Sequence, residues 1–166
     1  MIKYRVSNSG NMGGFTIIET MVVLAIIVVI LGIAIPSYVT LIPGYRLKAA
    51  GQDLYGNLQS AKMLAIKNNT LEDVSFDTAA GTYTKADGTV LNLNDVYDGY
   101  VSYGRHDSDP NVVTYTDDKV TFNARGMTQG PTGAVFLKNT KNQYIKIETQ
   151  PSGVITYKKW NGSAWE

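Results

Sequence analysis

The sequence predicts an α+β protein in which a long N-terminal helix packs on an antiparallel β-sheet domain. Two observations predict the helix: residues 15–35 are almost all apolar, and apolar residues then recur every three or four positions from Leu47. A third observation predicts the sheet, because short runs after Thr70 alternate apolar and polar residues between turn residues. We therefore expect a helix over 15–67, with a membrane-spanning first half and an amphipathic second half, and a β-rich globular domain over 68–166.

Residues 15–35 form the most apolar part of the chain. They hold 17 apolar side chains in 21 positions, and no Asp, Glu, Lys or Arg lies between Glu19 and Arg46. As a helix, 21 residues extend for about 31 Å, which matches the hydrocarbon thickness of a bilayer. The segment therefore predicts a transmembrane helix over 15–35.

Two alternatives to this anchor remain open. A buried helix of a soluble protein would normally have a polar face, and residues 21–35 have none. A secretory signal peptide would use Lys3 and Arg5 as its basic region and cleave after Gly32-Ile33-Ala34. The apolar run is longer than that of an ordinary signal peptide, and an acidic residue lies within it, so we favour the anchor.

Glu19 is that acidic residue. A carboxylate inside a bilayer costs a few kcal/mol and usually has a partner of opposite charge. The nearest cations in the sequence, Lys3 and Arg5, lie beyond a Gly-Gly pair. A positive charge must therefore come from elsewhere, and a newly exposed α-amino group is one source.

The N-terminal region resembles the leader and helix of type IV pilins and type II secretion pseudopilins. The residues that carry this resemblance are Met12-Gly13-Gly14 followed by Phe15-Thr16-Ile17-Ile18-Glu19 and an apolar run that ends near Pro36. The resemblance implies that residues 1–14 are a leader, that a prepilin peptidase cuts after Gly14, and that Phe15 becomes N-methylated. Glycines suit such a cut because a chain without side chains enters a peptidase groove easily.

The same resemblance implies how the subunit is used. The amine of Phe15 would pair with Glu19 of a neighbouring subunit during filament assembly, and Pro36 would interrupt the helix just past the membrane. Other pilin or pseudopilin subunits and the inner membrane are the implied partners, with secreted cargo a further possibility. The implied location is the bacterial inner membrane, single-pass, with the C-terminal domain periplasmic until the subunit enters a filament. The charges flanking the span are nearly balanced, so this orientation rests on the resemblance.

The second half of the helix has a different pattern. Pro36 and Pro43-Gly44 predict a kink or a partly melted stretch between them. The residues after it predict an amphipathic helix over 46–67 that packs on its own domain and ends at Lys67-Asn68-Asn69-Thr70. Its apolar positions are Leu47, Ala50, Leu54, Leu58, Ala61 and Ala65.

The remainder predicts short antiparallel strands joined by tight turns. Turn signals are Asp-Gly at 87–88, Asp117-Asp118, Lys141-Asn142 and Pro151-Ser152-Gly153, while the stretch 91–111 reads as a polar loop. The expected strands are 74–76, 81–84, 101–103, 112–116, 119–123, 134–138, 144–149 and 153–159.

This region is similar to the GspH/FimT family of minor pseudopilins and minor pilins. The resemblance rests on Ala61-x-x-x-Ala65-Ile66-x-Asn68-Asn69 with Val74-Ser75-Phe76-Asp77, on Phe122-Asn123-Ala124-Arg125-Gly126, and on Ile145-x-Ile147 with Gly153-Val154-Ile155. Arg125-Gly126 also has an ordinary interpretation as a strand end followed by a turn.

Catalytic chemistry finds little support in the sequence. The chain has no cysteine and one histidine, His106, which we expect in a solvated loop. Asp107, Asp109 and Asn111 resemble the start of a calcium loop, but the glycine and final glutamate of that motif are missing. We therefore expect no enzyme, no cofactor and no metal site, and calcium binding stays a weak alternative.

DNA binding is the alternative function, because FimT-like minor pilins include DNA-binding proteins for natural transformation. Lys158, Lys159 and Trp160, with Lys138, Lys141 and Lys146 on neighbouring strands, would form a small basic face with an aromatic residue. The chain from Phe15 onwards has 13 basic and 14 acidic residues, which argues against a nucleic-acid partner. The sequence thus favours a structural pseudopilin or minor pilin of a type II secretion or type IV pilus filament that takes part in protein secretion.

Overall fold

The computed structural model describes residues 14–107 and 109–166. The chain divides into two compact units, one that ends at Thr40 and one that comprises Leu41–Glu166. Helix α1 (Ile17–Asn68) contributes to both units, and the second unit contains all the strands. The expected leader, Lys3, Arg5 and the Met12-Gly13 pair lie outside the described residues, apart from Gly14.

Helix α1 is continuous through both prolines. The expected partly melted stretch is wrong, and Pro36 does not interrupt the helix, because residues 36–44 are helical throughout. Each proline removes a single backbone donor, and about two helical turns separate Pro36 from Pro43, so the hydrogen bonds between them hold the helix. The hydroxyl of Thr40 also donates to the carbonyl of Ser37 at 2.8 Å.

Helix α1 ends at Asn68, within the stop signal that the sequence predicts at residues 67–70. Asn69 adopts a left-handed conformation with φ 54°, and the N–H of Thr70 donates to the carbonyl of Ala65 at 3.2 Å. This is the hydrogen-bond pattern of a Schellman cap, which satisfies a carbonyl that the ending helix leaves unpaired. The chain then turns into the first strand.

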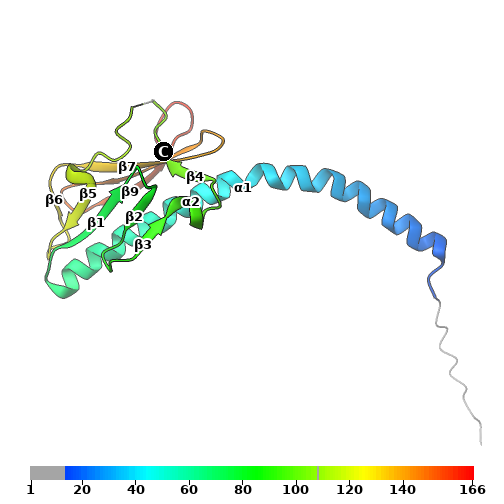
Figure 1. The fold of residues 1–166 in the computed structure, drawn as a ribbon, viewed down its shortest axis with the longest axis horizontal. Coiled ribbons are helices and arrows are strands. Elements are labelled where there is room, and N and C mark those ends of the chain that lie inside the picture. Colours follow the sequence, from blue (N-terminus) through cyan, green and yellow to red (C-terminus); the bar gives the residue numbers. More distant parts are fainter. Residues whose placement is uncertain (1–13, 108) are drawn as a thin grey trace, which may run out of the picture. The chain divides into compact units, whose positions relative to one another are not determined.

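The strands form two antiparallel sheets (Figure 1). The first has the order β3-β2-β1-β5-β6, and the second has the order β4-β7-β8-β9. The α+β prediction of a long helix packed on antiparallel sheet is confirmed. The bounds are β1 (Glu72–Asp77), β2 (Thr82–Thr84), β3 (Val90–Asn92), β4 (Val101–Tyr103), β5 (Lys119–Phe122), β6 (Thr128–Gln129), β7 (Gly133–Asn139), β8 (Tyr144–Thr149) and β9 (Ile155–Lys159).

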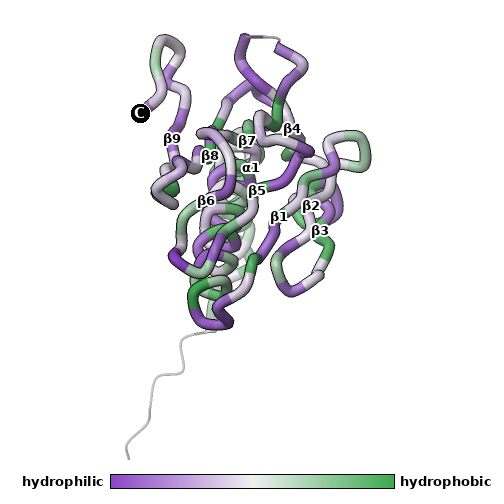
Figure 2. The backbone as a smooth tube through the Cα atoms, turned by 90° about the vertical axis from the view of Figure 1, so that its left-hand side faces the viewer, coloured by the Kyte–Doolittle hydropathy of each residue, from purple (hydrophilic) through white to green (hydrophobic). Residues whose placement is uncertain are grey.

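Both sheets contribute to one core against α1. In Figure 2, β8 and β9 lie on one side of α1, and β2 and β3 lie on the other. Val74 pairs with Val120 in the first sheet, and Val135 pairs with Ile147 in the second, so their side chains share the buried face. The strand alternation thus places apolar residues toward the helix.

Some sequence predictions in this unit are wrong. The stretch 112–116 forms a single bridge, Val113 to Val135, because the chain leaves the β7 edge and enters a 3-10 turn at Thr116. The stretch 91–111, expected as a polar loop around the strand 101–103, also contains the end of β3 and the short helix α2 (Leu93–Val96), while the expected strand is confirmed as β4. Asn92 caps α2 by accepting the N–H of Asn94 at 2.8 Å. A short 3-10 helix, η1 (Thr116–Asp118), precedes β5.

Candidate functional site

The start of α1 holds the residues for which the sequence predicts processing and assembly. Gly14 precedes the helix, and the side chain of Phe15 is 85% exposed. The backbone N–H of Glu19 donates to Oγ1 of Thr16 at 3.2 Å, so Thr16 caps the helix. Thr16 and Glu19 have the spacing of a capping box, a local signal that the sequence interpretation missed.

The Glu19 side chain is exposed on the third residue of the helix. Its negative charge is favourable there, because the N-terminal end of a helix dipole is positive. Among the described residues, none forms an ion pair with this carboxylate. The cap uses the backbone N–H of Glu19, so its carboxylate oxygens remain available to a partner.

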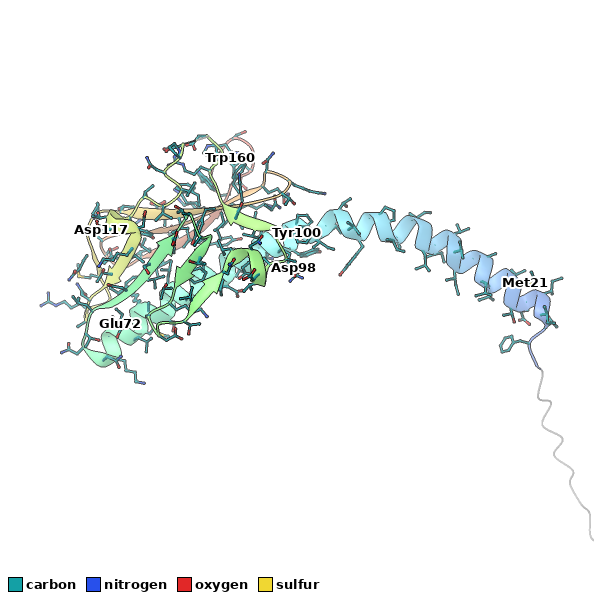
Figure 3. The ribbon with its side chains drawn as sticks, viewed as in Figure 1. Met21, Glu72, Asp98, Tyr100, Asp117 and Trp160 are labelled. Carbon is teal, nitrogen blue, oxygen red and sulfur yellow. The ribbon has the colours of Figure 1, made fainter. Side chains whose placement is uncertain are left out.

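The first half of α1 presents apolar side chains to its surroundings on all sides. Ile17 is 83% exposed, and Leu31, more covered than most, is still 47% exposed. The side chains around Met21 project outward from the helix (Figure 3). The helix is long and apolar enough to cross a membrane, and this composition fits a membrane anchor.

The second half of α1 docks on the second sheet through a glycine. A Cβ atom on Gly51 would come within 2.7 Å of Cε2 of Tyr157 and 3.1 Å of Cγ2 of Ile145. The helix axis can therefore approach β8 and β9 closely only because Gly51 has no side chain. Leu47, Leu54 and Leu58, all nearly inaccessible, fill the space on either side.

Polar contacts attach the same helix to the first sheet and to α2. Asn57 donates to the hydroxyl of Tyr83 at 2.8 Å, and the hydroxyl of Tyr97 donates to Asp53 at 2.6 Å. Burial raises the pKa of Tyr83 to about 12 and also raises the pKa of Tyr97. Arg46 forms an ion pair with Asp98, which follows α2. These pairs fix the rotation of α1 about its own axis as well as its distance from the sheet.

Two turns that carry the family resemblance meet beside the end of α1. Gly126 and Gly153 both have positive φ, 74° and 77°, and the turns touch at these glycines. Lys62 donates to the carbonyl of Gly153 at 2.9 Å, and Thr128 donates its hydroxyl to the carbonyl of Gln150 at 3.0 Å. The interpretation of Arg125-Gly126 as a strand end followed by a turn is confirmed, since β5 ends at Phe122 and both residues lie in the turn after it.

The residues expected for DNA binding are divided between the two faces of the second sheet, because Lys158 pairs with Lys146 on the outer face and Lys159 pairs with Ile145 on the face toward α1. Lys158 pairs with Lys146 across β9 and β8, but Lys146 forms an ion pair with Glu148 at 2.6 Å. Both side chains of that pair are less than one-fifth exposed. Lys159 is exposed, whereas the ring of Trp160 stacks on His106. The six residues proposed for a basic face are therefore not equally available.

His106 lies in a loop, as predicted, but its side chain is only partly exposed because it packs on other rings. Its ring stacks on Trp160 with centroids 3.9 Å apart and lies 5.4 Å from the ring of Trp165. The cause is Arg105, whose guanidinium lies 4.5 Å from the ring centre of Phe136 and fastens the loop to the sheet. No nearby sequence pattern could reveal this contact, because both tryptophans belong to the C-terminal end of the chain, several strands after His106.

Arg105 also accounts for the acidic residues that resemble a calcium loop. It forms ion pairs with Asp107 at 2.6 Å and with Asp109 at 3.0 Å. Its hydrogen bonds lower the pKa of Asp107. Within the described ranges, no cluster of three or more acidic or histidine side chains has a metal-binding arrangement.

Comparison with known proteins gives one match. The family model of the type II transport protein GspH matches residues 50–153, which is more than half of the chain. No curated protein and no solved structure matches the chain. The matched range contains α1 from Ala50 onwards, the first sheet, strands β4, β7 and β8 of the second sheet, and the Gly126 and Gly153 turns. The chain belongs to the GspH family.

Proposed function

We propose that this protein is a minor pseudopilin of a type II secretion system, stored in the inner membrane through residues 15–35 and then built into a filament. Membership of the GspH family supports a pseudopilin role in type II secretion, and this family is structural rather than enzymatic. Association with other pseudopilins follows from that membership. The remaining steps concern processing, orientation and assembly.

The observation that carries the proposal is the first half of α1. Its apolar side chains are exposed in the isolated chain, and such a surface is unstable in water. Lipid covers it in a membrane, and the apolar helices of neighbouring subunits would cover it in a filament. A segment with one apolar surface can thus occupy both environments in turn.

Glu19 gives a reason for the subunit to move from the membrane into the filament. A carboxylate inside a bilayer is costly unless a cation neutralises it. In our proposal, the peptidase cuts after Gly14, and the ammonium group of Phe15 in one subunit pairs with Glu19 of another. One such pair per contact would also favour a single axial stagger, as one buried polar residue does in a coiled coil. Pro36 would mark the membrane-proximal part of this helix, and the sheet domain would face the periplasm.

Processing is tested by intact-mass measurement and N-terminal sequencing of protein extracted from bacterial membranes. We expect a chain that starts at N-methylated Phe15. A chain that starts at Ile35 would mean that the segment is an ordinary signal peptide, and it would refute the anchor.

Assembly is tested with Glu19→Ala in cells that carry the secretion machinery. We expect normal membrane insertion but at least a tenfold loss of subunit in sheared filaments, because a buried ammonium group without its carboxylate is costly. Thr16→Ala is the matched control, since it removes the helix cap and leaves the carboxylate. Equal losses in both variants would mean that Glu19 acts through the helix start instead of through a neighbouring subunit.

A further inference from the structure

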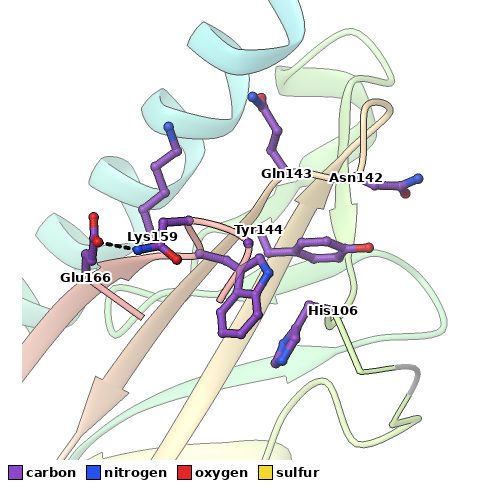
Figure 4. A pocket seen from close by; sticks show the side chains of 9 residues that line it. His106, Asn142, Gln143, Tyr144, Lys159 and Glu166 are labelled. Atoms are coloured by element: carbon purple, nitrogen blue, oxygen red, sulfur yellow. Dashed lines mark hydrogen bonds between the residues drawn. The ribbon is translucent and has the colours of Figure 1, made fainter. Parts of the chain in front are cut away.

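An open cavity lies at one end of the second sheet. It has a volume of about 690 Å³ and lies between the turn that joins β7 to β8 and the segment after β9 (Figure 4). His106, Asn142, Gln143, Tyr144, Lys159 and Trp160 contribute to its wall. Nothing in the proposed pseudopilin role uses this cavity.

Aromatic rings from three separate segments meet at the cavity. His106 comes from the loop after β4, Tyr144 from the start of β8, and Trp160 from the end of β9. The rings of His106 and Trp160 are stacked at 3.9 Å with an interplanar angle of 30°, and Tyr144 approaches His106 edge-on at 6.3 Å. Flat apolar surfaces are thus presented beside polar groups.

The rings are held in place by contacts that do not depend on a ligand. Arg105 fastens the loop of His106 through Phe136 and Asp107, and the N–H of Trp160 donates to the carbonyl of Tyr144 at 3.0 Å. The segment after Trp160 is secured to Lys159 by two backbone hydrogen bonds, of 2.7 and 2.9 Å, with Glu166. The cavity is therefore preformed, which lowers the entropic cost of binding.

The polar groups of the wall balance in charge. Lys159 brings one positive charge and Glu166 one negative charge, while Asn142 and Gln143 bring side-chain amides. Gln143 accepts a hydrogen bond from Asn139 at 2.7 Å, which orients its amide group. Amides next to aromatic faces suit a ligand that has hydroxyl groups, apolar C–H faces and no net charge.

One atom of the wall is unsatisfied. Nδ1 of His106 is buried and has no hydrogen-bond partner among the residues that the structure describes. Buried polar atoms nearly always have a partner, so an unpaired one beside a cavity indicates a missing donor or acceptor.

We propose that this cavity binds an uncharged oligosaccharide. The C–H faces of its sugar rings would pack on both Trp160 and Tyr144, and its hydroxyl groups would bond to Asn142, Gln143 and His106. A nucleic acid fits less well, because phosphates need cations and the nearby Lys146 is already paired with Glu148.

The chain provides its own probe for the test. Its two tryptophans are Trp160, which lines the cavity, and Trp165, whose ring lies 5.3 Å from that of Trp160. We would titrate the full chain in phospholipid nanodiscs, which contain no sugar detergent, with cellotetraose, chitotetraose and maltotetraose at up to millimolar concentration. We expect at least one of them to change the tryptophan emission with saturation.

Variants measured by calorimetry locate the binding. Trp160→Leu and Tyr144→Leu should each weaken binding by roughly tenfold, because each removes an aromatic face. Tyr45→Leu is the matched control, since Tyr45 is 69% exposed and lies outside the cavity wall. Melting curves identify any variant that does not fold. Because two cavity variants are measured, the test still gives a result if one of them does not fold.

Three outcomes would overturn the proposal. No saturable binding of any of the three sugars is the first, and equal affinities for Tyr144→Leu and Tyr45→Leu are the second. The third is binding of a thymidine oligonucleotide that weakens steeply with salt and with Lys159→Gln while the sugars do not bind. That result would assign the cavity to single-stranded nucleic acid instead.

Discussion

Gly153 occupies a position that no larger residue can take without moving a neighbouring turn. Its φ of 77° is left-handed, and a Cβ atom there would overlap the carbonyl oxygen of Gly126. The contact joins two turns that strands β6, β7 and β8 separate in the sequence, and it lies beside Lys62 of α1. Two independent constraints, the backbone angle and the close approach, thus act on this residue.

We predict that Gly153→Ala destabilises the sheet domain by at least about 3 kcal/mol, because strain and overlap add. Gly81→Ala is the matched control, since Gly81 has a similar φ of 69° but nothing lies within 4 Å of its added Cβ. It should cost only about 1 kcal/mol. Thermal melting followed by circular dichroism measures both, and similar losses would contradict the close approach of the two turns.

Two of the glycines in the second half of α1, Gly51 and Gly56, have different surroundings. Gly51 is buried against Tyr157 and Ile145, whereas Gly56 is exposed and has no atom within 4 Å of an added Cβ. Helix propensity alone favours alanine at both positions. The difference between them therefore measures the packing of α1 on the second sheet.

We predict that Gly56→Ala stabilises the domain by about 0.5–1 kcal/mol and that Gly51→Ala destabilises it by about 1–3 kcal/mol. Chemical denaturation of the full chain, with each variant beside the parent, gives both values. Stabilisation by Gly51→Ala would show that the helix does not need this close approach.

At the scale of the whole molecule, several tyrosines connect α1 and the two sheets. Burial raises the pKa of Tyr83 and of Tyr115 to about 12, and it raises the pKa of Tyr97 and Tyr103 as well. In the unfolded chain a tyrosine has a pKa of about 10. Between pH 10 and 12 the unfolded state therefore loses protons that the folded state keeps.

We predict that the contribution of these tyrosines to stability is complete below about pH 10 and falls as the pH rises toward 12. Each such group lowers the free energy of unfolding by up to about 1.4 kcal/mol per pH unit in that range. Tyr83→Phe should reduce the slope of the free energy of unfolding against pH by the contribution of one tyrosine. Denaturation at stepwise pH measures this slope. The same slope in the variant and the parent would contradict the burial of this hydroxyl.

The sequence alone determined much of this molecule because the relevant signals are local. The apolar run of 15–35, the stripe from Leu47 to Ala65 and the alternation of the strands each follow from neighbouring residues and a fixed period. The same holds for the Asn69 stop signal. Family membership was also predictable, since its motifs are short stretches of chain.

Only the tertiary structure decided the features that depend on distant partners. The stacking of His106 on Trp160, the pairing of Lys146 with Glu148 and the approach of Gly51 to Tyr157 each depend on how strands and loops pack. No periodicity encodes the first and third of these contacts, because several strands separate His106 from Trp160, and nearly the whole sheet domain separates Gly51 from Tyr157. The sequence thus revealed the long apolar helix, and the packing of the sheet domain created the cavity.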